Sequence, residues 1–123
     1  ALVVTTGITL QPALEAAELL RQEGIKISIL HMHTIKPLDT ITLLEYAADV
    51  DVIITMEEHT ILGGLGGAVA EVILEKNFAQ PKRFKRIGIP DMFADEYGSQ
   101  ASLMKRFGIT SENLISTIKQ LRI

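Results

Sequence analysis

The chain has 123 residues, 47% of them hydrophobic, and carries a formal net charge of −3 at pH 7. This length and apolar content predict a single domain over residues 1–123. The negative charge argues against nucleic-acid binding by phosphate neutralisation. The absence of cysteine excludes disulfides, thiolate catalysis and cysteine zinc sites. Without an apolar run of about 18 residues or a signal-peptide pattern, we expect a cytoplasmic protein with no membrane partner.

The first third of the chain alternates strand and helix patterns. The β-branched run at residues 2–6 predicts a buried strand. Apolar residues at helical spacing predict a helix over 10–23, with Thr9 as its N-cap and Gly24 after its end. Residues 25–30 predict a second strand, and their alternation suggests an edge position.

The middle of the chain continues this alternation. Pro37 places residues 35–39 in a loop, because proline lacks a backbone donor and restricts the residue before it. A helix is predicted over 40–48, with Thr40 as its cap, and a third buried strand over 51–56.

The last part of the chain is predicted to contain one strand and three helices. The first helix covers residues 68–76, and a strand follows over 84–89. Two further helices are expected over 100–107 and 111–121, the second of them capped by Thr110.

Strands alternating with helices predict parallel βαβ units and a three-layer α/β/α sandwich with a mainly parallel sheet. With a strand order of 2-1-3-4, the carboxyl ends of the first and third strands would be neighbours. Thr6 and Gly7 would then lie opposite Glu57, Glu58 and His59. The sequence has no internal repeat and no linker.

The segment EEHTILGGLGG, residues 57–67, combines acidic, imidazole and glycine residues. Its glycines do not match the dinucleotide fingerprint, since Val69 stands at the third glycine position, and no Walker Gly-Lys-Ser or Gly-Lys-Thr occurs. The glycines are interpreted as positions for positive φ and close packing of a helix on the sheet. An anion site at the helix N-terminus is the alternative.

Adjacent strand residues point to opposite sides, so Glu57 and Glu58 are not expected to form a catalytic carboxylate pair. Either carboxylate could hold His59 or accept backbone donors in the turn, and a structural hydrogen bond is favoured over general-base catalysis. His31 and His33 would share a face of an extended strand, but without a third ligand nearby no metal site is predicted.

Two further features favour structural interpretations. The basic run at residues 82–86 is interpreted as a solvated approach to a strand, not as an anion or nucleic-acid patch. Phe93 and Tyr97 suggest a packed surface or a partner contact. No Gly-x-Ser-x-Gly nucleophile motif is present, so no catalytic residue is predicted.

Several motifs in this order resemble the C-terminal domain of transketolase, and they cover essentially the whole chain. They are Thr34–Asp39, Glu57–His59 followed by Gly63–Gly66, Ile87–Asp91 and Phe107–Thr110. The sequence is also similar to the matching domains of deoxyxylulose phosphate synthase and of the β subunit of the 2-oxo acid dehydrogenase first component.

The resemblance implies a three-domain enzyme of the pentose phosphate pathway that transfers a two-carbon ketol unit between sugar phosphates. In this family the first two domains bind thiamine diphosphate and magnesium, with a Gly-Asp-Gly motif that is absent here. No catalytic, cofactor-binding or metal residue is therefore predicted in this chain. The family strand before residue 2 is missing, so an excised domain or C-terminal section is expected.

The resemblance also implies partners: the N-terminal and middle domains or subunits of the same enzyme, in a homodimer. The isolated domain is predicted to be inactive. The candidate site is a structural turn, or an anion or interface site, made of Thr6, Gly7, Glu58, His59, Gly63, Gly64, Gly66 and Gly67. A small anion- or nucleotide-binding regulatory module remains the alternative function.

Overall fold

The computed structural model describes residues 1–90 and 99–122. Phe93 and Tyr97, predicted to form a packed surface or partner contact, lie outside these residues. In chain order the elements are β1 (Leu2–Thr5), a 3-10 turn η1 (Gly7–Thr9), α1 (Leu10–Gln22), β2 (Ser28–His31), α2 (Thr40–Ala47), β3 (Val52–Thr60), α3 (Leu65–Lys76), β4 (Arg83–Ile89), α4 (Gln100–Arg106) and α5 (Ser111–Leu121).

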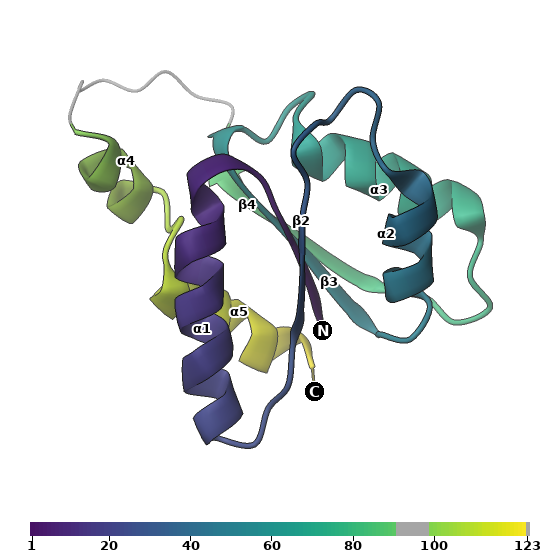
Figure 1. The fold of residues 1–123 in the computed structure, drawn as a ribbon, viewed down its shortest axis with the longest axis horizontal. Coiled ribbons are helices and arrows are strands. Elements are labelled where there is room, and N and C mark those ends of the chain that lie inside the picture. Colours follow the sequence, from purple (N-terminus) through teal and green to yellow (C-terminus); the bar gives the residue numbers. More distant parts are fainter. Residues whose placement is uncertain (91–98, 123) are drawn as a thin grey trace.

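The four strands form one parallel sheet in the order β2-β1-β3-β4. Helices α1 and α5 cover one face of the sheet, and α2 and α3 cover the other (Figure 1). This is the α/β/α sandwich and strand order that the sequence predicts, and both are confirmed. None of the helices in the described part of the chain is long and apolar enough to cross a bilayer.

Alternating side chains of the central strands supply two separate cores. On β1, Val3 packs with the core under α1 and α5, whereas Leu2 and Val4 pack with the core under α2 and α3. Burying a Leu or Val side chain fully contributes about 1.5–3 kcal/mol, so both helical layers are held by apolar burial.

Several predicted element boundaries differ from the structure. β2 begins at Ser28 and not at residue 25. β3 continues past Met56 to Thr60, because β4 pairs with it as far as Thr60 opposite Ile89. The strand therefore includes the polar residues 57–60, which were predicted to follow it.

Helix α3 begins at Leu65, three residues earlier than predicted. The predicted helix leaves Gly66 and Gly67 outside it, and glycine is a poor helix former. In the structure they belong to the first turn of the helix.

The N-caps agree only in part with prediction. Asp39, and not Thr40, caps α2, since its Oδ1 accepts the Thr42 N–H at 3.1 Å. Hydrogen bonds from the side chain and backbone of Thr42 lower the pKa of Asp39. Thr9 precedes α1 but makes no side-chain cap bond there. Thr110 caps α5 as predicted, accepting the Asn113 N–H at 3.2 Å.

Replacing Thr110 tests the cap of α5, the helix that closes one core. Thr110→Ala should lower the free energy of unfolding by about 1 kcal/mol, since the Asn113 N–H loses its acceptor. Thr110→Ser keeps a hydroxyl and should stay within about 0.5 kcal/mol of the parent protein. Urea unfolding followed by circular dichroism measures both, and equal losses would show that the hydroxyl does not cap the helix.

Candidate functional site

The carboxyl ends of β1 and β3 lie side by side, since Thr5 is in register with Met56. The η1 turn then crosses toward β3. The Thr9 hydroxyl lies 2.7 Å from the Thr6 carbonyl and 2.9 Å from the Met56 carbonyl, and it has one proton to donate to either. This buried threonine therefore links the turn after β1 to β3.

Glu57 is fully buried, although it is ionisable and lies next to the glycine loop. Its Oε2 accepts the Leu65 N–H at 2.6 Å and its Oε1 accepts the Gly66 N–H at 3.3 Å. These are the first two amides of α3, which have no acceptor within the helix. A carboxylate here also interacts favourably with the helix dipole. Glu57 thus supplies the N-terminal cap that the glycines cannot provide.

Three glycines allow close packing around Glu57 and the start of α3. A Cβ at Gly64 would collide with the Glu57 carboxylate, and a Cβ at Gly88 on β4 would lie 3.1 Å from the Glu57 Cγ. A Cβ at Gly66 would lie 2.8 Å from the Arg86 side chain and 2.9 Å from the Thr55 hydroxyl oxygen. A larger residue at any of these positions would require the neighbouring atoms to shift.

The position of Glu57 disfavours phosphate binding at the N-terminus of α3. A helix N-terminus next to a glycine loop is where phosphate groups bind in nucleotide enzymes. Here the Glu57 carboxylate already accepts the Leu65 and Gly66 amides. A phosphate would compete with a buried negative charge for the same donors.

Glu58 points to the other side of β3, as the strand alternation predicts. Its Oε2 accepts a hydrogen bond from the Gln100 side-chain amide at 2.5 Å, which connects β3 to α4. Gly7 has a φ of +59°, and a Cβ there would lie 2.8 Å from the Glu58 Oε1. The structure therefore brings Thr6, Gly7 and Glu58 together, while Glu57 faces α3.

The remaining predicted site residues do not converge. His59 is exposed, and its imidazole makes no hydrogen bond with a described residue, so neither glutamate holds it. Gly63 has a φ of +71°, which a glycine adopts without strain. Gly67 lies in α3 with open space where a Cβ would be.

His31 and His33 lie close together at the end of β2, with ring centroids 5.3 Å apart. The His31 Nδ1 is 2.8 Å from the Thr5 hydroxyl. Burial, followed by the charge of His33, lowers the pKa of His31, so His31 is neutral at pH 7. Across residues 1–90 and 99–122, no group of three or more His, Cys, Asp or Glu residues is placed to hold a metal ion.

The basic run before and along β4 is used for internal hydrogen bonds to backbone carbonyl oxygens. These bonds connect the start of β4 to the segment after α2 and to the end of α5. They also connect the middle of β4 to the segment that follows β3. The pairs are Lys82 with Val50 at 2.6 Å, Arg83 with Leu121 at 2.6 Å, and Arg86 with Ile61 at 3.0 Å.

Sequence reasoning left Glu57 and Gly88 out of the candidate site. Ile53, Thr55 and Glu57 are alternate residues of one strand and are all buried. Since Ile53 belongs to the α2–α3 core, a period of two continued to residue 57 predicts a carboxylate under α3. No comparable sequence pattern indicated that Gly88 lies beside Glu57, apart from its place in the motif Ile87–Asp91.

This architecture can be compared with known protein families. Residues 1–114 match the family model described as "Transketolase, C-terminal domain". The chain belongs to the transketolase C-terminal domain family. The resemblance found in the motifs is thereby confirmed.

Relatives carry names from this enzyme group. A Sinorhizobium fredii protein assigned to the transketolase family is 40% identical over 120 residues, covering 97% of this chain and 34% of that protein. A transketolase C-terminal section from Methanocaldococcus jannaschii is 38% identical, covering 96% of this chain and 35% of that protein. The 1-deoxy-D-xylulose-5-phosphate synthase of Caldanaerobacter subterraneus is 35% identical, covering 96% of this chain and 18% of the synthase.

A solved structure agrees with these relationships. The protein described as "Split gene transketolase, inactive beta4 tetramer" superposes with a TM-score of 0.86 at 33% identity. The match covers 98% of this chain and 38% of that one. This chain therefore corresponds to one part of longer transketolase-type proteins.

Two neighbouring glycines of α3 provide a matched test of the close packing. Gly66→Ala should lower the free energy of unfolding by about 1–3 kcal/mol, because its methyl group meets Arg86 and Thr55. Gly67→Ala has open space and should leave stability unchanged or raise it by up to about 1 kcal/mol. Chemical unfolding of both variants measures the difference, and a Gly66→Ala protein as stable as Gly67→Ala would contradict the packing described.

Proposed function

We propose that this chain is the C-terminal domain of a transketolase-type, thiamine-diphosphate-dependent enzyme, and that it contributes to assembly and not to catalysis. In this proposal residues 1–123 form one domain of a longer enzyme or of its C-terminal subunit. The supporting observation is the internal use of Glu57, whose carboxylate caps α3 and is closed off from solvent. The segment at residues 57–67, which combines acidic, imidazole and glycine residues, then has a structural role.

The two carboxylates of the EEH motif, Glu57 and Glu58, do not fit a magnesium–diphosphate group. A magnesium ion that carries a diphosphate is usually held by one or two protein carboxylates. Of the two in the motif, Glu57 is bound to α3, and Glu58 accepts from Gln100. No catalytic step is therefore assigned to residues of this chain. Thiamine diphosphate and magnesium would be bound by the other domains or subunits.

The parent reaction in this proposal is transfer of a two-carbon ketol unit between sugar phosphates in the cytoplasmic pentose phosphate pathway. The parent enzyme would be a homodimer, with this domain completing contacts between its subunits. The partners would be the N-terminal and middle domains, which agrees with the short share of each longer relative that this chain covers.

A second member of the family has support of its own. Several relatives are named 1-deoxy-D-xylulose-5-phosphate synthase, including one from Geobacter sulfurreducens that is 38% identical over 112 residues. A role as the C-terminal domain of such a synthase, or of a 2-oxo acid dehydrogenase β subunit, is thus the competing proposal. An anion- or nucleotide-binding regulatory module is less compatible with the buried Glu57 carboxylate at α3.

Calorimetric titration of the purified chain with thiamine diphosphate and magnesium tests this division of roles. The chain alone should give no saturable heat and no ketol transfer, because its helix N-terminus is already capped by Glu57. The chain joined to its companion cofactor-binding polypeptide should bind the cofactor and turn over sugar phosphates. Saturable binding or turnover by the chain alone would overturn the proposal, and synthase activity of the joined protein would select the competing one.

A further inference from the structure

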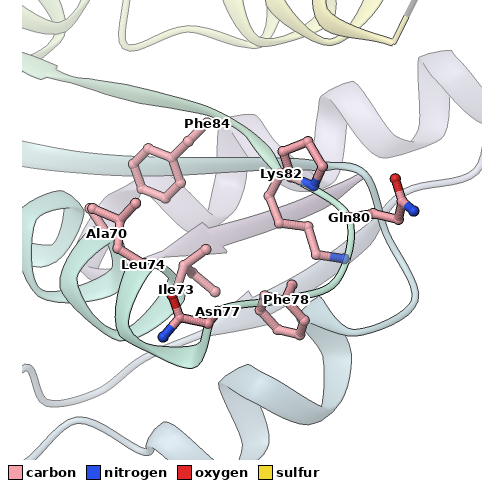
Figure 2. A pocket seen from close by; sticks show the side chains of 9 residues that line it. Ala70, Ile73, Leu74, Asn77, Phe78, Gln80, Lys82 and Phe84 are labelled. Carbon is pink, nitrogen blue, oxygen red and sulfur yellow. The ribbon is translucent and has the colours of Figure 1, made fainter.

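An apolar hollow lies between the C-terminal part of α3 and the start of β4. Side chains of α3 form one wall, and Phe84 and Lys82 lie across the opening (Figure 2). Its volume is about 280 Å³. Leu74, at its rim, is 74% exposed. An exposed leucine beside an apolar hollow is the kind of surface that marks an interaction site.

Two polar side chains at this hollow, Asn77 and Lys82, already have hydrogen-bond partners, since Asn77 donates to the Glu75 carbonyl oxygen. Lys82 donates to the carbonyl oxygens of Val50 at 2.6 Å and Ala48 at 3.3 Å, and its ammonium group lies 4.5 Å from the centroid of the Phe78 ring. Sites for drug-sized ligands usually measure about 300–1,000 Å³ and offer a few free polar groups. The size and apolar walls therefore suit one or two inserted apolar side chains better than a nucleotide or sugar phosphate.

A second, more polar hollow continues from the first around Gln80, Pro81 and Lys82, which line both. It reaches Ala1 and, on its other side, Arg122.

This second hollow is predominantly basic. Lys82, Arg83 and Arg122 line it, and among the described lining residues Asp51 carries the single carboxylate. Such a surface is electrostatically complementary to an acidic segment.

We infer that the hollow at Leu74 is a docking site for the companion cofactor-binding polypeptide of the same enzyme, which inserts an apolar side chain flanked by acidic residues. The inference rests on the proposed function. Relatives of this chain are about three to five times longer, as coverages of 34% and 18% indicate, so a large companion is available to cover this face. Residues before Ala1 in such a longer polypeptide would emerge beside the basic hollow that leads to Leu74.

Maleimide labelling tests the inference cleanly, because the chain contains no cysteine. Leu74→Cys introduces one thiol at the hollow, and Leu19→Cys introduces a control thiol on α1, where Leu19 is 50% exposed. In the isolated chain both thiols should react readily. In the complex or longer polypeptide, labelling at residue 74 should slow by at least about tenfold, since a buried thiol reacts only after local opening. Labelling at residue 19 should change less than about twofold.

The rates are read by mass spectrometry of the peptides that contain residues 74 and 19, so thiols of the companion do not interfere. Equal labelling at residue 74, in a complex that forms and turns over substrate, would overturn the inference while leaving the proposed function intact. If labelling at residue 74 slows as the concentration of the isolated chain rises, the hollow is covered by a second copy of this chain, and the inference is overturned. Failure of any complex to form would overturn both proposals.

A charge variant provides an independent readout. Leu74→Arg should weaken association with the companion by about tenfold or more, because it puts a cation into an apolar contact. Leu19→Arg, on the opposite layer, should leave the dissociation constant within about threefold of the parent value. Equal effects of the two substitutions would contradict docking at the hollow.

Discussion

The structure around the central motif depends on one interaction, the acceptance of the first two amides of α3 by the buried Glu57 carboxylate. A buried carboxylate is costly unless it is hydrogen-bonded, and a helix beginning with Leu-Gly-Gly has no side-chain cap of its own. The two amides thus provide the hydrogen bonds that the carboxylate needs, and the carboxylate provides the acceptor that the amides lack. The glycines at 64 and 88 follow from this constraint, because they let the loop and β4 approach the Glu57 side chain closely, whereas Gly66 lets the helix approach Arg86 and Thr55.

The same geometry separates the two adjacent glutamates. Glu57 is directed to the α3 layer and Glu58 to Gly7 and Gln100 on the other side of β3. Two carboxylates on opposite faces of a strand cannot act as a catalytic pair, in agreement with the expectation from the strand alternation. Glu58 instead connects α4 with the sheet. Both residues position helices, in agreement with the proposed scaffold role.

The sequence predicts the layers of this fold well, because alternating strand and helix patterns admit few parallel topologies. It predicts element ends less well. Asp39 and Thr40 are both good capping residues, and only the backbone geometry shows that Asp39 accepts the Thr42 amide. Likewise, residues 57–60 look like a polar turn, but pairing with β4 keeps them in the strand.

The candidate site was harder to predict, since its central residue is of a type that is usually exposed. Glutamate after a strand suggests a solvent-facing side chain, and Gly66 and Gly67 suggest a loop. In the structure the Glu57 side chain is buried and the two glycines are helical, because the Glu57 carboxylate supplies the cap that stabilises a glycine-rich first turn. Only the two-residue period from Ile53 through Thr55 to Glu57 could have indicated this.

Residue-resolved hydrogen exchange of the Leu65 and Gly66 amides, by NMR in the parent protein, tests the central interaction most directly. The first amides of a helix normally exchange quickly, because they have no acceptor within the helix. If Glu57 accepts them in a closed environment, both should exchange at least about a hundredfold more slowly than in an unstructured chain. Exchange at the unstructured rate, with the rest of α3 still protected, would contradict the account.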